Sequence, residues 1–100
     1  MTTLQELETI VPDIIHQLTK IRIKLSKYKK MDTDYRAKTL MNQIDATIKE
    51  YQNIFSTYKN TPCLQNKNFD NFVKEMDQYV KEASRVCDKI FEFESVLGYD

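Results

Sequence analysis

The sequence has few of the residues that form tight turns. It contains one glycine (Gly98) and two prolines (Pro12 and Pro62), and no Asn-Gly or Asp-Gly pair occurs. A β-sheet protein of 100 residues needs many tight turns, and these depend on glycine, proline and such dipeptides. The chain is therefore predicted to be all-α, with long helices and few connections.

Other absences narrow the classes of protein further. No apolar stretch approaches the ~18 residues that cross a membrane, and the first residues lack the basic start and apolar segment of a signal peptide. Cys63 and Cys87 are not clustered as a zinc site or a disulfide framework would require. We therefore expect no metal and no cofactor, and a reducing compartment, cytoplasmic or nuclear.

What the chain does contain is three stripes of apolar residues spaced three and four apart, which is the heptad pattern of packed helices. The first stripe comprises Leu4, Leu7, Val11, Ile14, Leu18, Ile21, Leu25 and Tyr28. The second comprises Ala37, Leu40, Met41, Ile44, Ile48, Tyr51, Ile54, Phe55 and Tyr58. The third comprises Phe69, Phe72, Val73, Met76, Tyr79, Val80, Ala83, Val86, Cys87, Ile90, Phe93 and Leu97.

The stripes predict one domain over residues 1–100, an antiparallel three-helix bundle running up, down and up. The helices are expected over about 3–30, 33–59 and 69–97. The heptad phase changes between the first two stripes, which indicates a chain reversal near residues 29–33. Pro62 ends the second helix, since proline cannot continue it.

The helix ends carry recognisable capping residues. Thr3 and Glu6 read as a capping box, Asp32 or Thr33 is expected to cap the second helix, and Asn68 the third. Gly98 suits the left-handed residue that follows a helix end. Pro12 predicts either a kink or a fresh start, and the unbroken stripe favours the kink.

Charge gives an independent check on this topology. Bases without acids close the first helix, and acids close the third, with Asp88, Glu92 and Glu94. In an up-down-up bundle these two ends lie side by side, so their charges complement each other. Such surface pairs contribute little individually, about 0–1 kcal/mol.

Nothing in the sequence indicates an enzyme. His16 falls on the side of its helix away from the stripe, without an evident pocket or orienting partner. Asp32 and Asp34 lack further ligands at calcium-binding spacing and are expected to serve as helix caps. Cys87 is expected to be a small buried hydrophobe, and Cys63 lies about 27 Å from it along the helix, too far for a disulfide.

The basic segment 20–30 is the most asymmetric feature of the chain. It is compatible with a solvated helix end beside acids, with phosphates of nucleic acid or an anionic membrane, or with an acidic protein. These alternatives stay open at this point.

Two apolar residues fall on the wrong faces of their helices, and they lie near that basic segment. Ile23 and Phe91 are predicted to lie at similar heights on the outside of the bundle, flanked by Lys20, Lys24 and Lys27. An apolar centre with a charged rim is typical of a protein-binding patch. The sequence therefore favours a non-enzymatic protein–protein interaction module or assembly subunit, whose partner is another protein or, in a homo-oligomer, a second copy of this chain. The alternative is nucleic-acid or anionic-membrane binding through residues 20–30.

Overall fold

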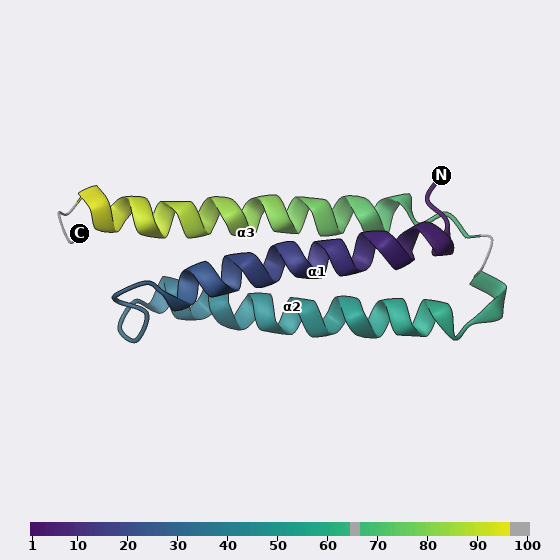
Figure 1. The fold of residues 1–100 in the computed structure, drawn as a ribbon, viewed down its shortest axis with the longest axis horizontal. Helices are drawn as coiled ribbons and strands as arrows, with labels where there is room; N and C mark the ends of the chain where they lie inside the picture. The colour runs from purple at the N-terminus through teal and green to yellow at the C-terminus, as the bar shows by residue number, and fades with distance from the viewer. Residues whose placement is uncertain (65–66, 97–100) are drawn as a thin grey trace.

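The computed structural model describes residues 1–64 and 67–96, and within them the chain is a three-helix bundle (Figure 1). The helices are α1 (Leu4–Ser26, 23 residues), α2 (Tyr35–Lys59, 25 residues) and α3 (Asp70–Val96, 27 residues), with a short 3-10 helix, η1 (Pro62–Leu64), after α2. The described residues contain no strand, so the predicted all-α class is confirmed.

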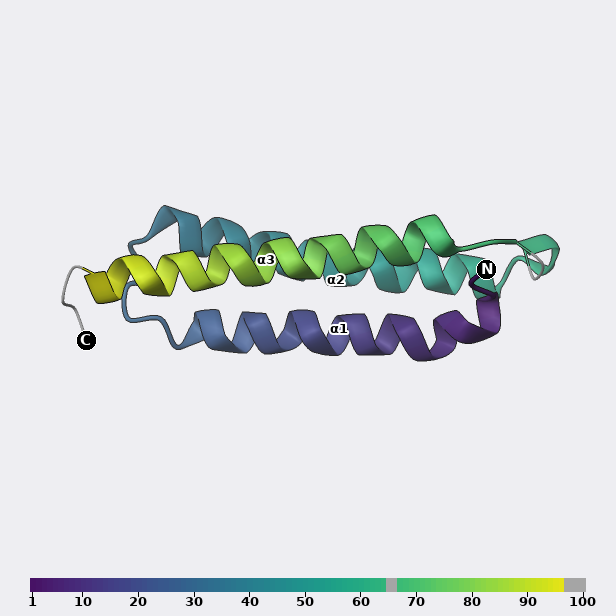
Figure 2. The ribbon, with the colours of Figure 1, turned by 90° about the horizontal axis from the view of Figure 1, so that it is seen from above.

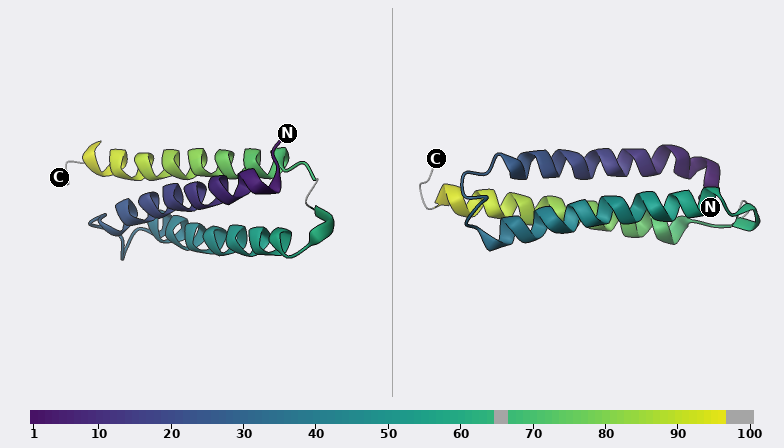
Figure 3. Two further views of the ribbon diagram at one scale, coloured as in Figure 1. Left: turned by 45° about the vertical axis from the view of Figure 1, so that its right-hand side comes forward. Right: turned by 90° about the horizontal axis from the view of Figure 1, so that it is seen from below.

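The topology is up, down and up, as the heptad phases predicted. Helices α1 and α3 run in the same direction and α2 runs against them, forming a rod of 54 × 21 × 16 Å. Figures 2 and 3 show α1 lying to one side of α2 and α3. One face of α1 therefore contacts the other two helices, and its opposite face is turned away from both.

Every buried hydrophobic residue of the described core belongs to a predicted stripe, while Phe93 and Leu97 of the third stripe lie outside the side chains that the structure describes. Fully buried side chains come from all three helices, because the heptad spacing brings one face of each helix inward. The largest fully buried side chains of the core are those of Leu7, Ile14, Leu18, Leu25, Ile44, Met76 and Ile90. Burying each such side chain stabilises the fold by roughly 1.5–3 kcal/mol before conformational entropy is subtracted.

Helix α1 begins as predicted and runs through Pro12 without a break. The Thr3 hydroxyl accepts the Glu6 amide at 3.2 Å, and the Glu6 carboxylate accepts the Thr3 amide at 3.3 Å, which completes the capping box. Because Pro12 lies inside one continuous helix, a fresh helix start at this residue is excluded.

The connection between α1 and α2 differs from the prediction. Helix α1 ends at Ser26 rather than near residue 30, and α2 begins at Tyr35 rather than at 33. Tyr28 is buried as the stripe predicted, but it sits in a turn in which its amide donates to the Leu25 carbonyl. Periodicity marks a buried residue and does not distinguish a helix from a turn that follows it.

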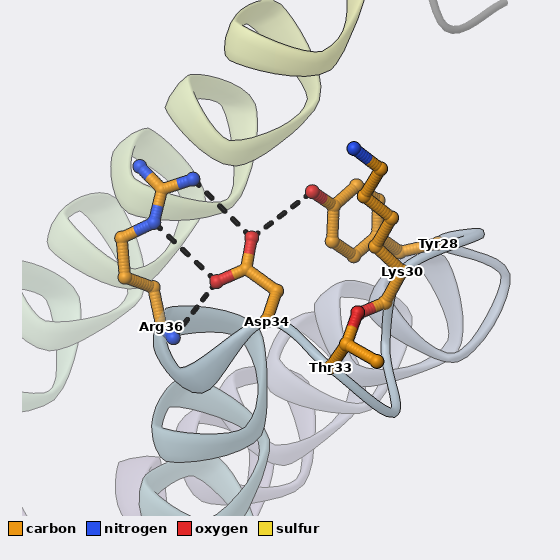
Figure 4. A network of polar contacts seen from close by, with 5 residues as sticks. All are labelled: Tyr28, Lys30, Thr33, Asp34 and Arg36. Atoms are coloured by element: carbon orange, nitrogen blue, oxygen red, sulfur yellow. Dashed lines mark hydrogen bonds and ion pairs between the residues drawn. The ribbon is translucent and has the colours of Figure 1, made fainter.

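Asp34 caps α2, so the expected caps Asp32 and Thr33 were wrong. The Asp34 carboxylate accepts the Arg36 amide at 2.9 Å and the Tyr28 hydroxyl at 3.0 Å, and it pairs with the Arg36 guanidinium (Figure 4). The turn itself is closed by the amides of Thr33 and Asp34, which both donate to the Lys30 carbonyl. Of the pair Asp32 and Asp34, both of which were expected to serve as helix caps, Asp34 has this role.

The other end of the bundle is closed by aromatic packing and by the N-terminal residues. Tyr58 packs against Phe69 and Phe72 at ring distances of 4.8 and 5.7 Å. The Asn68 side chain accepts the first amide of α3, that of Asp70, at 2.9 Å, although Phe69 rather than Asn68 directly precedes the helix. The Thr2 carbonyl accepts the Phe69 amide. Gly98, the predicted end of α3, lies outside the described residues.

Candidate interaction surface

Three of the predicted partner-binding residues lie on the outward side of α1, two within the helix and Lys27 as the helical-conformation residue that caps its end. Lys20, Ile23 and Lys27 are three and four residues apart, which places them on one face of a helix. All three are exposed, and Ile23 leaves 47% of its surface accessible. We call Lys20, Ile23 and Lys27 the outer patch.

The other two predicted residues lie elsewhere, in the seam between α1 and α3. Lys24 donates to Asp88 at 3.0 Å and lies over the Phe91 ring, 5.3 Å from its centroid. The Phe91 ring meets the buried Tyr28 ring edge-on at 5.3 Å. Phe91 is therefore half-buried against α1, and the prediction that it lies on the outside beside Ile23 was wrong.

The seam and the outer patch point in different directions. Successive residues of a helix are rotated by about 100°, so Lys24 and Ile23 project to different sides of α1. Lys24 faces α3, as its contact with Asp88 shows, while Ile23 faces solvent. The prediction for Phe91 was made from its position on its own helix alone. It was wrong because the large ring reaches across the seam to Tyr28 and Lys24, and a projection of a single helix does not include contacts with another helix.

Ion pairs neutralise part of the basic segment 20–30. Arg22 pairs with Asp45 of α2, and Lys24 pairs with Asp88 of α3. The hydrogen bond to Asp88 raises the pKa of Lys24 above its usual value of 10.5, so Lys24 stays charged at neutral pH. This contact confirms the predicted complementarity between the ends of α1 and α3. Within the described residues, Lys20 and Lys27 make no ion pair.

A groove between α2 and α3 escaped the sequence prediction. It has a volume of about 350 Å³, and Tyr35, Leu40, Tyr79 and Val86 are among its lining residues. Tyr35 is 81% exposed at the first position of α2, and the Tyr79 hydroxyl is buried without a hydrogen-bond partner in the described part of the chain. Tyr79 was counted as an apolar residue of the third stripe. Its polar hydroxyl is the feature of the sequence that distinguishes it from the other residues of that stripe.

The remaining predicted positions behave as ordinary structural or surface residues. His16 is exposed on α1, as predicted. Cys87 is buried and Cys63 exposed, and both thiols are free; burial raises the pKa of the Cys87 thiol.

Among residues 1–64 and 67–96, no three His, Cys, Asp or Glu side chains are grouped to hold a metal ion. In the same residues, no helix is long and apolar enough to cross a membrane.

Comparison with known proteins adds no relative: no family model, no curated protein and no solved structure matches this chain. The function is therefore argued from the surface of this bundle alone.

The different settings of Ile23 and Phe91 predict different effects on stability. Phe91→Ser removes an aromatic contact worth about 0.5–1.5 kcal/mol and a cation–π contact worth about 0.5–1 kcal/mol. We expect the free energy of unfolding to fall by about 1–3 kcal/mol in urea titrations. Ile23→Ser, at an exposed position, should change it by less than about 0.5 kcal/mol. Equal losses for the two variants would place Ile23 in the core and contradict the outer patch.

Proposed function

We propose that this chain is a non-enzymatic interaction module or assembly subunit that binds another protein through the outer patch of α1. The partner has a small apolar surface flanked by acidic groups. In this interface Ile23 is the apolar anchor, and Lys20 and Lys27 form its charged rim.

The observation that carries the proposal is the setting of Ile23. Exposed apolar residues are common on protein surfaces and need no explanation singly. Ile23, however, is 47% exposed and lies on the side of α1 away from the buried Leu18 and Leu25. It stands between two lysines that make no ion pair with any residue in the described part of the chain. An apolar centre with a polar rim is the usual anatomy of a protein interface.

The second candidate function is binding of nucleic acid or an anionic membrane through residues 20–30. Its support is the same pair of exposed lysines, Lys20 and Lys27. Two other cations of the segment, Arg22 and Lys24, are engaged by Asp45 and Asp88, which weakens the field that phosphates would meet. The apolar Ile23 at the centre of the patch favours a protein.

The proposal is tested by capture experiments with the immobilised chain and a lysate of the native organism. Ile23→Ser should abolish capture of the main bound protein while helix content and melting remain unchanged. Tyr35→Ser is the matched control, because it also removes an exposed large apolar side chain but lies on α2. It should leave capture unchanged.

Salt distinguishes the two candidate functions. Binding to phosphates weakens steeply between about 50 and 200 mM salt, whereas an apolar anchor keeps much of its affinity. If Lys20→Ser with Lys27→Ser abolishes binding, and Ile23→Ser does not, the electrostatic alternative replaces the proposal. Equal capture by Ile23→Ser and wild type would also overturn it.

The proposed setting is a reducing compartment, cytoplasmic or nuclear. Cys63 is exposed and free, and exposed thiols persist where reductants keep them from forming disulfides. Cys87 is buried and contributes to the core as an apolar residue.

A further inference from the structure

A row of four charges runs along the outer side of α1, each seven residues from the next. It comprises Glu6, Asp13, Lys20 and Lys27, which share a face because seven residues are almost two turns. All four are exposed, and none makes an ion pair with another described residue. The first half of the row is acidic and the second half is basic.

We infer that this row pairs with the same row of a second copy, so that two bundles associate through antiparallel α1 helices. When Lys20 faces Asp13 of the other copy, Lys27 faces Glu6 in the same register, because both intervals are about 10.5 Å. Two-fold symmetry repeats both contacts, giving four ion pairs. This inference rests on the proposed function and names its partner.

The helix macrodipole does not account for the row. It favours acids in the first turn and bases in the last, and its effect fades beyond those turns. Asp13 lies more than two turns from the start of α1 and Lys20 more than one and a half turns from its end, so both are beyond the terminal turns. The other helices follow this preference only in part: α2 has Lys59 in its last turn but no acid in its first, and α3 has Asp70 in its first turn but no base in its last.

The same register gives Ile23 an apolar neighbour. In this register Ile23 of one copy lies level with Ile10 of the other. Ile10 is less than one turn from Pro12 along α1. Pro12 borders a groove of about 450 Å³ between α1 and α2, whose apolar lining includes Ile15 and Phe55. The outer patch of each copy thus meets the edge of this groove in the other.

The dimer is weak, because the paired face is small. A helix of 23 residues is about 35 Å long and offers a strip about 10 Å wide, or about 350 Å² per copy. Stable interfaces bury about 800 Å² per partner. Association is therefore expected only at high concentration, and its electrostatic part should be lost in about 0.5 M salt.

The test is sedimentation equilibrium of the full chain at up to about 1 mM, a concentration at which even a Kd near 1 mM leaves half of the chain paired. Wild type should dimerise at low salt. Lys20→Glu and Asp13→Lys should each raise the dimer Kd about tenfold, since each replaces two attractive surface contacts with repulsive ones. An equimolar mixture of the two variants should restore association, because every changed contact is then complementary. Glu6 is left intact because its carboxylate completes the capping box of α1.

Lys81→Glu is the matched control. Lys81 is exposed on α3, so this variant carries the same net charge as Lys20→Glu on another face. It should dimerise like wild type, but its mixed pair with Asp13→Lys should form less readily than that of Lys20→Glu with Asp13→Lys, because one of the two central contacts still places two lysines opposite each other. Circular dichroism verifies that each variant is folded.

Three results would overturn the inference: a monomeric wild type at about 1 mM and low salt, a dimer indifferent to both charge reversals, or variants that fail to recover when mixed. A monomeric wild type whose capture of another protein depends on Ile23 would leave the proposed function standing while the self-pairing fails. If dimerisation follows the charge swap but is unchanged by Ile23→Ser, the pairing of the charged rows is supported and the role of Ile23 in the outer patch is contradicted.

Discussion

Ile44→Asp is expected to unfold the whole bundle. Ile44 lies in the middle of α2 and is 0% exposed, so the substitution places a carboxylate among the apolar residues of three helices. An unpaired buried charge costs several kcal/mol, and the lost burial of Ile44 adds about 1.5–3 kcal/mol. A domain of this size is stable by only about 5–15 kcal/mol. Far-UV circular dichroism should show loss of helix and of the cooperative melting transition at 25 °C.

Met76→Asp should have the same effect from α3, since Met76 is also 0% exposed. His16→Ala is the control, because His16 is exposed on α1 and should change the free energy of unfolding by less than about 0.5 kcal/mol. If the aspartate variants melted like His16→Ala, the assignment of the core faces would be wrong.

The core could be predicted because heptad spacing is a property of each helix by itself. Leu7, Ile14 and Leu18 had to share a face once α1 was helical, and that face had to be buried. The direction of the helices followed from the short connections. Lys24 beside Asp88 then appeared as the charge pattern predicted.

The predictions that were wrong concern residues whose role or burial depends on a side chain from another segment of the chain. Asp34 rather than Asp32 or Thr33 caps α2, because Asp34 alone combines the Arg36 amide with the Tyr28 hydroxyl. Phe91 was assigned to the outer surface because its position falls outside the apolar stripe of α3. Contacts of this kind depend on which side chains of two elements meet, and periodicity carries no such information.

The candidate site was predicted in part. Lys20, Ile23 and Lys27 were identified and are exposed as expected. The acidic half of the row, Glu6 and Asp13, was missed although its seven-residue interval is visible in the sequence. Its significance depends on knowing that this face of α1 is turned away from α2 and α3, which only the arrangement of the three helices shows.

Asp34→Ala tests whether the contacts across the α1–α2 turn hold this end of the bundle together. The carboxylate caps α2 and accepts the Tyr28 hydroxyl from the turn after α1, so the variant loses both functions at once. Losing a cap costs about 0.5–2 kcal/mol, and losing a hydrogen bond to a charged group adds about 1.5–3 kcal/mol. Urea titration at neutral pH should show a loss of about 2–5 kcal/mol.

The pH dependence of stability distinguishes the two contributions of Asp34, that of its negative charge and that of its capping of α2. Burial opposes ionisation of Asp34, but the hydrogen bonds from Arg36 and Tyr28 outweigh it and hold the pKa of Asp34 below the ordinary 3.8. The folded state therefore binds the proton less readily than the unfolded state. The stabilisation is complete above the unfolded pKa near 3.8 and is lost as the pH falls through the lower folded pKa.

Asp34→Asn is the matched variant, since asparagine caps helices about as well as aspartate but carries no charge. Wild type should be more stable than Asp34→Asn at pH 6, and the difference should shrink as the pH falls below about 4, where aspartate becomes protonated. Asp34→Ala should remain less stable than Asp34→Asn at every pH, because only asparagine retains the cap. A wild-type advantage over Asp34→Asn that does not change with pH would show that the carboxylate acts by shape rather than by charge.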